Sequence, residues 1–149
     1  MDDGGLFKTV TDESPDAVVF ADTAGVIRYW NRGAQELFGW SAEDALGQSM
    51  DLIIPENLRD RHWEGYHRVM AGGESRYGRR ELLKVPALRA DGSRVSVEFT
   101  LQMAEHPEFG AIAVAILRDA SEAFAEMREL RKRVAELEAA NSSKAEQPR

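Results

Sequence analysis

The stretch from residue 14 to residue 48 reads SPDAVVFADTAGVIRYWNRGAQELFGWSAEDALGQ, and the order of its elements decides the fold. Two short apolar runs, 18–21 and 26–30, flank a turn of small and polar residues, so we expect two strands joined by a tight turn. Asn31 is a typical cap for a following helix, and Gly39 is a typical stop. The stretch therefore predicts a strand, a turn, a second strand and a short helix.

Further helices are predicted after this hairpin. Ser41 begins a second short helix, because Ser41-Ala42-Glu43-Asp44 matches a capping box in outline. A longer helix is expected over 55–71, and the residues that share one of its faces are Leu58, His62, Tyr66 and Val69. The segment 76–89 then has the pattern of an irregular stretch or a strand, in which Pro86 indicates an edge strand or an interruption.

Composition excludes several classes of protein and site. The formal net charge of −7 argues against broad affinity for nucleic acid, because phosphate binding needs a basic surface. The chain has no cysteine, which excludes disulfides, thiolate metal sites and a cysteine nucleophile. There is no apolar run long enough for a membrane span and no visible secretory signal, so we expect a cytoplasmic protein with no membrane contact.

Two later motifs complete a known pattern. Residues 91–93, Asp-Gly-Ser, separate two strand-like runs as a hairpin turn does, and residues 113–119 form a last apolar strand that ends in Arg-Asp. Together with the opening stretch, these motifs resemble a PAS domain over roughly residues 10–121. The resemblance implies an α+β fold, with a five-stranded antiparallel sheet and flanking short helices. It also implies a sensor module over residues 6–119 that holds a ligand or a partner.

The pattern changes from Ala120 onward, where apolar residues fall at the a and d positions of heptads and Asn141 falls at an a position. We expect a signalling helix over 120–140 and a disordered tail over 141–149. Two arrangements stay open: a coiled coil that joins two copies as a homodimer, or an amphipathic helix folded back on its own domain. The output is expected from a signalling partner or a neighbouring domain.

The helix expected over 55–71 contains the candidate sensory residue, His62. Its sequence resembles that of FixL-type oxygen sensors, which have Pro-Glu, then Arg-His, a Tyr four residues after the His and an Arg two residues later. By this resemblance His62 is the iron ligand of a heme b, Tyr66 lies on the same helix face, and Arg68 holds a heme propionate. Neutral imidazole suits iron. The alternative is a packed or hydrogen-bonded core histidine.

The resemblance assigns strand residues to the same pocket. Phe99 and Leu101 share one face by strand alternation and would crowd a gas ligand. Ala115 matches a small residue that leaves room for the porphyrin. FixL-type domains also have an Arg after a Gly that contacts bound oxygen, and both Arg79 and Arg80 follow Gly78 closely enough to be candidates.

Six arginines lie close together in the sequence, and two interpretations of them stay open. They form a solvated loop, or they form a mouth that receives carboxylates or propionates. The second interpretation adds Arg76 to the cofactor-binding candidates. The six positions are Arg59, Arg61, Arg68, Arg76, Arg79 and Arg80.

The leading prediction is therefore a heme-containing sensor of a gas or of redox state. The alternative is a PAS dimerisation or interaction module that binds a small organic acid or no ligand. A flavin–cysteinyl adduct is excluded because the chain has no cysteine. No nucleophile elbow, phosphate loop or paired-histidine metal motif occurs, so we expect no enzymatic activity.

Overall fold

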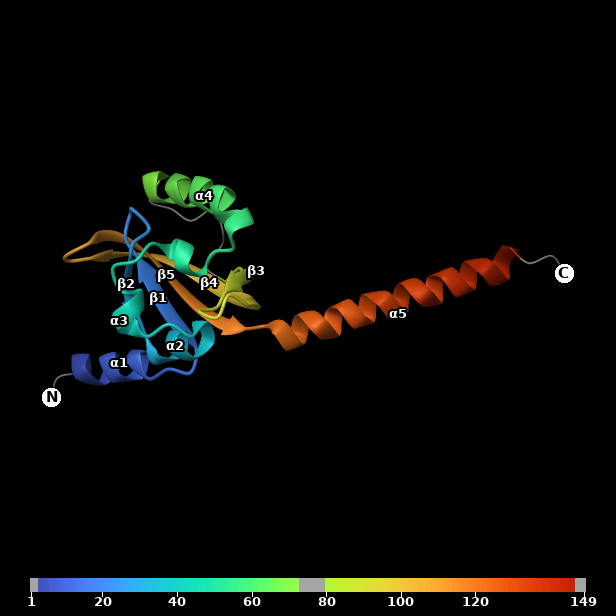
Figure 1. Cartoon of the computed structure of the whole chain (residues 1–149), viewed down its shortest axis with the longest axis horizontal. Coiled ribbons are helices and arrows are strands. Elements are labelled where there is room, and N and C mark those ends of the chain that lie inside the picture. The colour runs from blue at the N-terminus through green and yellow to red at the C-terminus, as the bar shows by residue number, and fades with distance from the viewer. Residues whose placement is uncertain (1–2, 73–79, 147–149) are drawn as a thin grey trace. The chain divides into compact units, whose positions relative to one another are not determined.

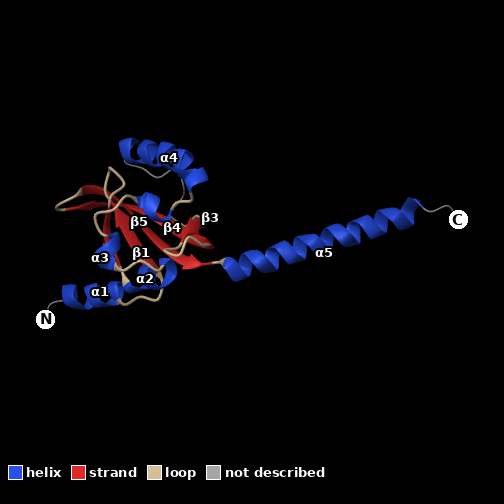
Figure 2. Ribbon diagram, viewed as in Figure 1, coloured by secondary structure: helices blue, strands red, loops and turns tan. Residues whose placement is uncertain are grey.

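The computed structural model describes residues 3–72 and 80–146, and the chain divides into two compact units at the junction of Asp119 and Ala120. The first unit is built around one sheet, and the described part of the second unit is one helix (Figures 1 and 2). No helix within the described residues is both long and apolar enough to cross a membrane.

Five antiparallel strands form the sheet, which confirms the predicted fold class. Their order across the sheet is β2-β1-β5-β4-β3. β1 and β5 come from opposite ends of the unit and pair along their length, from Ala17 opposite Leu117 to Ala21 opposite Ala113. The strands are β1 (Ala17–Ala21), β2 (Ile27–Trp30), β3 (Leu83–Leu88), β4 (Arg94–His106) and β5 (Gly110–Asp119).

β3 lies at the edge of the sheet, as Pro86 indicates. Pro86 pairs with Ser96 of β4, and the described residues form no strand on its other side. Proline has no N–H to donate, so an edge strand is the place where it costs no ladder hydrogen bond. The segment expected over 76–89 forms a strand over Leu83–Leu88, and residues 73–79 lie outside the described part of the chain.

The hydrophobic core lies between one face of the sheet and the short helices. Val95 and Val97 of β4 are buried at alternate positions, as a strand with one face in the core requires. The covering elements are α2 (Arg32–Phe38), α3 (Ala42–Ala45) and the 3₁₀ turns η1 (Met50–Ile53) and η2 (Glu56–Leu58). The residues of these elements that belong to the buried core cluster are Ala34, Phe38, Ala45 and Ile53.

The predicted helix caps are confirmed. The side chain of Asn31 accepts a hydrogen bond from the backbone N–H of Ala34 and caps α2. Gly39 ends that helix with φ of 81°, a left-handed conformation that glycine adopts without strain. Ser41 caps α3 by accepting from the N–H of Asp44. Local sequence signals therefore placed both short helices correctly.

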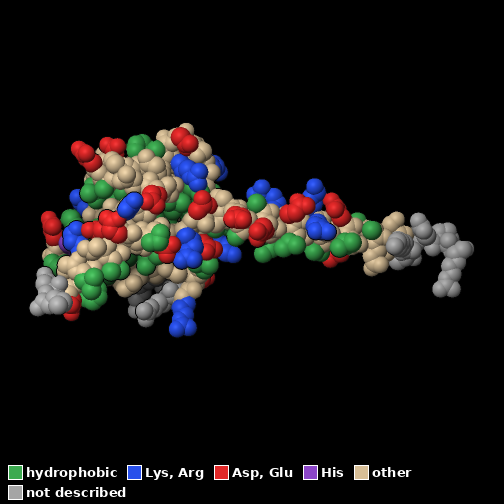
Figure 3. All heavy atoms as spheres, turned by 90° about the horizontal axis from the view of Figure 1, so that it is seen from below, with side chains coloured by type: hydrophobic (Ala, Val, Ile, Leu, Met, Phe, Trp, Pro, Cys, Tyr) green, Lys and Arg blue, Asp and Glu red, His purple; other side chains and the backbone are tan. Residues whose placement is uncertain are grey.

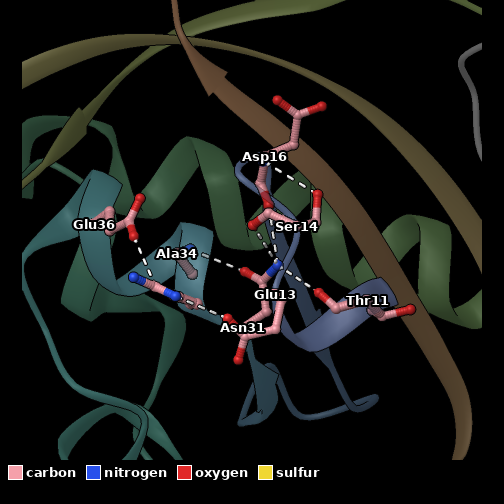
Figure 4. A network of polar contacts seen from close by, with 8 residues as sticks. Thr11, Glu13, Ser14, Asp16, Asn31, Ala34 and Glu36 are labelled. Atoms are coloured by element: carbon pink, nitrogen blue, oxygen red, sulfur yellow. Dashed lines mark hydrogen bonds and ion pairs between the residues drawn. The ribbon is translucent and has the colours of Figure 1, made fainter. Parts of the chain in front are cut away.

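Asn31 does more than cap a helix (Figure 4). Its Oδ1 accepts from the backbone N–H of Val18 in β1 as well as from Ala34, at 2.8 and 2.9 Å. Its Nδ2 donates to the carbonyl oxygens of Thr11 and Asp16, at 2.9 and 3.0 Å. The side chain is buried, so one amide joins the N-terminal segment, the first strand and α2 inside the protein.

Gly33 allows this junction to close. A Cβ atom at Gly33 would lie 2.3 Å from the carbonyl oxygen of Asp16 and 2.7 Å from that of Ser14. Both atoms belong to the backbone and cannot rotate away. Any side chain at Gly33 would therefore push α2 away from the segment that precedes β1.

The first unit begins earlier than the predicted start of the sensor module at residue 6. Its first element is the helix α1, which spans Asp3–Asp12. The helix buries no residue, and Leu6, Phe7 and Val10 are exposed. Its attachment comes from its last turn, where the hydroxyl of Tyr29 donates to Asp12 and Asn31 donates to the carbonyl of Thr11.

The long helix expected over 55–71 begins later in the chain than predicted. α4 spans Arg59–Gly72, and residues 56–58 form the 3₁₀ turn η2 instead. The N–H of Leu58 donates to the carbonyl of Pro55, which closes this tighter turn. The α-helix therefore starts one turn after the proline.

The C-terminal helix is longer than predicted. α5 spans Ser121–Glu146, so residues 141–146, expected to be disordered, are helical. Neither glycine nor proline occurs from Ala120 to Gln147, so no residue in that range stops the helix. Polar composition alone was a poor guide to the end of this helix.

Asn31→Ala should lower the free energy of unfolding by about 3 kcal/mol, because it leaves buried backbone groups of Val18, Thr11 and Asp16 without partners. Urea denaturation measures this. The control is Gln35→Ala on the exposed side of α2, which should change the free energy by less than about 0.5 kcal/mol. A loss below about 1 kcal/mol for Asn31→Ala would contradict the central role given to this amide.

Candidate functional site

Hydrogen bonds from the side chains of Arg59, Trp63 and Tyr66 hold the candidate sensory helix α4 to the rest of the unit. Trp63 donates from Nε1 to the Oδ1 of Asp51 in η1, at 2.6 Å. The hydroxyl of Tyr66 donates to the carbonyl oxygen of Asp22, at 2.5 Å. No residue of α4 is fully buried. Arg59, the first residue of α4, also donates to the carbonyl oxygens of Ile54 and Asp51. The helix is therefore attached mainly by side-chain hydrogen bonds.

The β1–β2 turn forms the surface on which Trp63 lies. A Cβ atom at Gly25 would come within 2.1 Å of two carbon atoms of the Trp63 ring. Gly25 has φ of 78°, and its N–H donates to the carbonyl of Asp22 at 2.9 Å. The turn thus needs glycine at position 25 for two reasons, namely the positive φ of its backbone and the close approach of the Trp63 ring.

The carboxylate of Asp22 shapes this turn. Its Oδ1 accepts from the N–H groups of Ala24 and Val26, and its Oδ2 accepts from Arg28 at 2.9 Å. Burial raises the pKa of Asp22, but these hydrogen bonds outweigh burial, so the net effect is a lowered pKa. The turn is therefore held by an ionised carboxylate.

His62 is half-buried beside these aromatic residues. Its ring centroid lies 4.8 Å from that of Trp63 and 5.7 Å from that of Tyr66. Its Nδ1 is buried and has no hydrogen-bond partner among the described residues. Burial, together with the nearby His67, lowers the pKa of His62 below its ordinary 6.5 despite the charge of Asp51. The imidazole is therefore neutral near pH 7.

Tyr66 shares the helix face of His62, as the sequence predicts, and it is a hydrogen-bond donor. Burial and the charge of Asp22 raise the pKa of Tyr66 above its ordinary value, so the phenol stays protonated. A protonated hydroxyl is required to donate to the carbonyl of Asp22. The second aromatic attachment is therefore independent of pH across the physiological range.

The predicted arginines are not gathered around His62 in the described residues. Arg68 is exposed and forms an ion pair with Glu64 one turn away, at 3.3 Å. Arg80 is also exposed. Arg76 and Arg79 lie outside the described residues. A surface pair such as Arg68–Glu64 contributes little stability, which leaves the guanidinium free to exchange partners.

The predicted strand residues do come together. Leu101 of β4 pairs directly with Ala115 of β5, and Phe99 pairs with Leu117. Phe99 and Ala115 pack against the core cluster, and Leu101 is half-buried. The three predicted residues therefore form one apolar surface on two neighbouring strands.

The other two histidines have ordinary roles. His67 is exposed, and its ring stacks on that of Trp63 with centroids 5.7 Å apart. His106 ends β4, where its Nδ1 accepts from the N–H groups of Glu108 and Phe109. Neither shares the unpartnered nitrogen of His62.

Two adjoining surface hollows, of about 230 and 350 Å³, lie elsewhere in the unit. Both are lined by Glu36 and Leu37 of α2 and by Arg89, and neither is lined by His62. Arg89 donates to the carboxylate of Asp119 at 3.1 Å beside them. These hollows belong to the α2 side of the unit and not to the predicted sensory residues.

Sequence reasoning missed the groups that hold α4, namely the carbonyl of Asp22, the surface of Gly25 and the carboxylate of Asp51. Each meets its partner through the tertiary fold, across many residues of chain. The available signal was Trp63, a large residue beside the candidate histidine, but nothing in the sequence says which group receives its N–H.

A family model described as the PAS fold matches residues 11–125. The chain belongs to the PAS family. The PAS domain of a protein from Colwellia psychrerythraea superimposes with a TM-score of 0.67 at 21% identity, and the match covers 81% of this chain and 99% of that one. The five-stranded sheet and its covering helices are thus those of the PAS fold.

Three curated relatives contain a region similar to this PAS domain. An uncharacterized protein of Azorhizobium caulinodans is 40% identical over 83% of this chain and 17% of its own length. The oxygen sensor protein DosP of Escherichia coli is 27% identical over 85% of this chain and 16% of its own length. The sensor protein FixL of Bradyrhizobium diazoefficiens is 36% identical over 37% of this chain and 11% of its own length. This chain therefore spans less than a fifth of these relatives.

Gly25→Ala should displace Trp63 and lower the free energy of unfolding of this PAS domain by about 3 kcal/mol, because strain at positive φ adds to the clash. The indole N–H resonance of Trp63 should shift as its hydrogen bond to Asp51 is lost. Gly47→Ala is the matched control, since Gly47 has φ of 84° with nothing within 4 Å. It should cost only about 1 kcal/mol and leave that resonance in place. Equal effects of the two substitutions would contradict the contact.

Proposed function

We propose that this PAS domain senses a diatomic gas and that His62 holds the heme b to which the gas binds. One observation carries the proposal: His62 is half-buried and neutral, with a buried ring nitrogen that has no hydrogen-bond partner in the part of the chain that the structure describes. Neutral imidazole is the form that ligates iron. Similarity to the oxygen sensor protein DosP and to the sensor protein FixL supports this choice of ligand.

The residues present fit such a group. Iron in a porphyrin needs one protein ligand, so the lack of any cluster of three metal-ligating side chains among the described residues does not bear on it. His62 would provide the ligand, and Phe99, Leu101 and Ala115 would provide an apolar surface for the porphyrin. The exposed guanidinium groups of Arg68 and Arg80 are available for carboxylates at the rim.

A bound heme supplies a coordination position that accepts a diatomic gas. The roles of the chain's own residues follow from their positions. Trp63 and Tyr66 orient α4, and with it the ring of His62. Phe99 and Leu101 provide large apolar side chains on β4. Ala115, opposite Leu101 on β5, has a small side chain that leaves space for a ligand.

We propose that β5 relays the signal. Ala115 of the apolar surface and Asp119, the last residue before the helical unit, belong to the same strand, so a change in packing at Ala115 has a short covalent path to α5. A ligand shifts such an equilibrium by as much as its affinity differs between the two states. We assign no catalysis to this chain, and we propose that a neighbouring domain or a partner protein produces the output.

His62→Ala should abolish the strong violet absorption band of protein expressed with a heme supply, along with its shift on adding dithionite and carbon monoxide, because the iron ligand is lost. His67→Ala is the matched control, since His67 lies on the same helix but is exposed. It should leave the spectrum unchanged. Circular dichroism and urea denaturation should show that both variants remain folded.

A heme spectrum that survives His62→Ala in a folded protein would overturn the ligand assignment. A colourless wild-type protein that also fails to take up added heme would overturn the heme proposal. The function would then be a PAS interaction module for a small organic acid or for no ligand, and extraction of bound acids followed by mass spectrometry would separate those two cases.

A further inference from the structure

Helix α5 has an apolar stripe that the helix itself cannot bury. Met127, Leu130, Val134 and Leu137 are 47, 56, 52 and 70% exposed. Their spacing of three and four residues places them on one side of the helix. In the view of Figure 3, hydrophobic side chains gather along the lower side of the helix and most charged side chains lie along its upper side.

The charges beside the stripe are arranged in a specific order. In the heptad whose a and d positions form the stripe, Glu126 and Arg133 occupy g positions. Arg131 and Glu138 occupy e positions. In a parallel coiled coil, a g residue faces the e residue five positions later on the partner. Glu126 would thus face the partner's Arg131, and Arg133 would face the partner's Glu138.

We propose that α5 pairs with α5 of a second copy of this chain as a parallel, in-register coiled coil. The occupant of the stripe is a second copy because the charge pattern is complementary to itself: every charged g position meets an opposite charge at e. The inference does not depend on which ligand the PAS domain binds.

An antiparallel pair is disfavoured by the same residues. Suppose that the two helices ran in opposite directions with their four stripe residues packed on each other. Arg131 would then face the partner's Arg131, and Arg133 would face the partner's Arg133. Like charges so placed repel. Asn141, at an a position, would lie against the partner's Ala123. In the parallel arrangement Asn141 instead meets the partner's Asn141, and a polar residue at such a position is known to specify register.

Glu126→Arg in the full 149-residue chain should raise the dissociation constant of the dimer about tenfold, measured by analytical ultracentrifugation, because it places arginines opposite each other. Adding Arg131→Glu should restore the constant to within about threefold of wild type, since the facing charges are again opposite. The effect cannot come from loss of helix, because an arginine at 126 gains a favourable neighbour one turn away, Glu122.

Glu129→Arg is the matched control, because it makes the same charge change at a c position on the outer side. It loses an i,i+4 pair with Arg133 within its own helix. A purely helical effect would therefore make Glu129→Arg the more damaging variant, whereas the proposal predicts that Glu126→Arg is. A monomeric wild-type chain, or the reverse order of the two variants, would overturn the proposal.

Orientation has its own test, because the chain contains no cysteine. Asn141→Cys should form a disulfide-linked dimer rapidly under mild oxidation, and Ser143→Cys, on the outer side, should do so slowly. In the antiparallel overlap the two residues 141 would lie about 27 Å apart along the axis, too far to link. A dimer that does not link faster through residue 141 than through residue 143 would overturn the parallel arrangement.

Discussion

The PAS unit depends on the buried side-chain amide of Asn31. This one group receives hydrogen bonds from β1 and α2 and donates to the segment before β1. Inside a protein, where water cannot replace a lost partner, such a group is costly to leave unpaired and stabilising when fully paired. The junction also requires Gly33, whose missing Cβ is the space occupied by the carbonyl of Asp16.

The candidate sensory helix is attached in a different way. α4 buries no residue completely, and its connections are hydrogen bonds made by the side chains of Arg59, Trp63 and Tyr66. Segments with little buried apolar surface open at low free energy, and ligand-binding elements are commonly drawn from them. A rigid junction at Asn31 and a lightly attached helix at His62 suit a module in which one element responds while the sheet keeps its shape.

The second unit has the opposite character from the first. The PAS unit contains a buried apolar core of its own, whereas α5 exposes Met127, Leu130, Val134 and Leu137. An isolated helix of this kind has little stability of its own, because most helical stability in proteins comes from packing of an apolar face. The PAS unit is therefore stabilised by packing in its own interior. Helix α5 instead needs another apolar surface against which its stripe can pack.

The amino-acid sequence by itself determined the features that depend on neighbours in the chain. Asn31 and Gly39 define α2, Pro86 restricts β3 to an edge, and alternation puts Phe99 and Leu101 on one face. Only the tertiary structure decided that Trp63 rests on Gly25 and donates to Asp51. It also decided that the buried nitrogen of His62 has no partner within residues 3–72 and 80–146, and that Arg68 is exposed. The physical reason is that caps, turns and periodicity act within a few residues, whereas burial and hydrogen-bond partners depend on which distant segments the fold brings together.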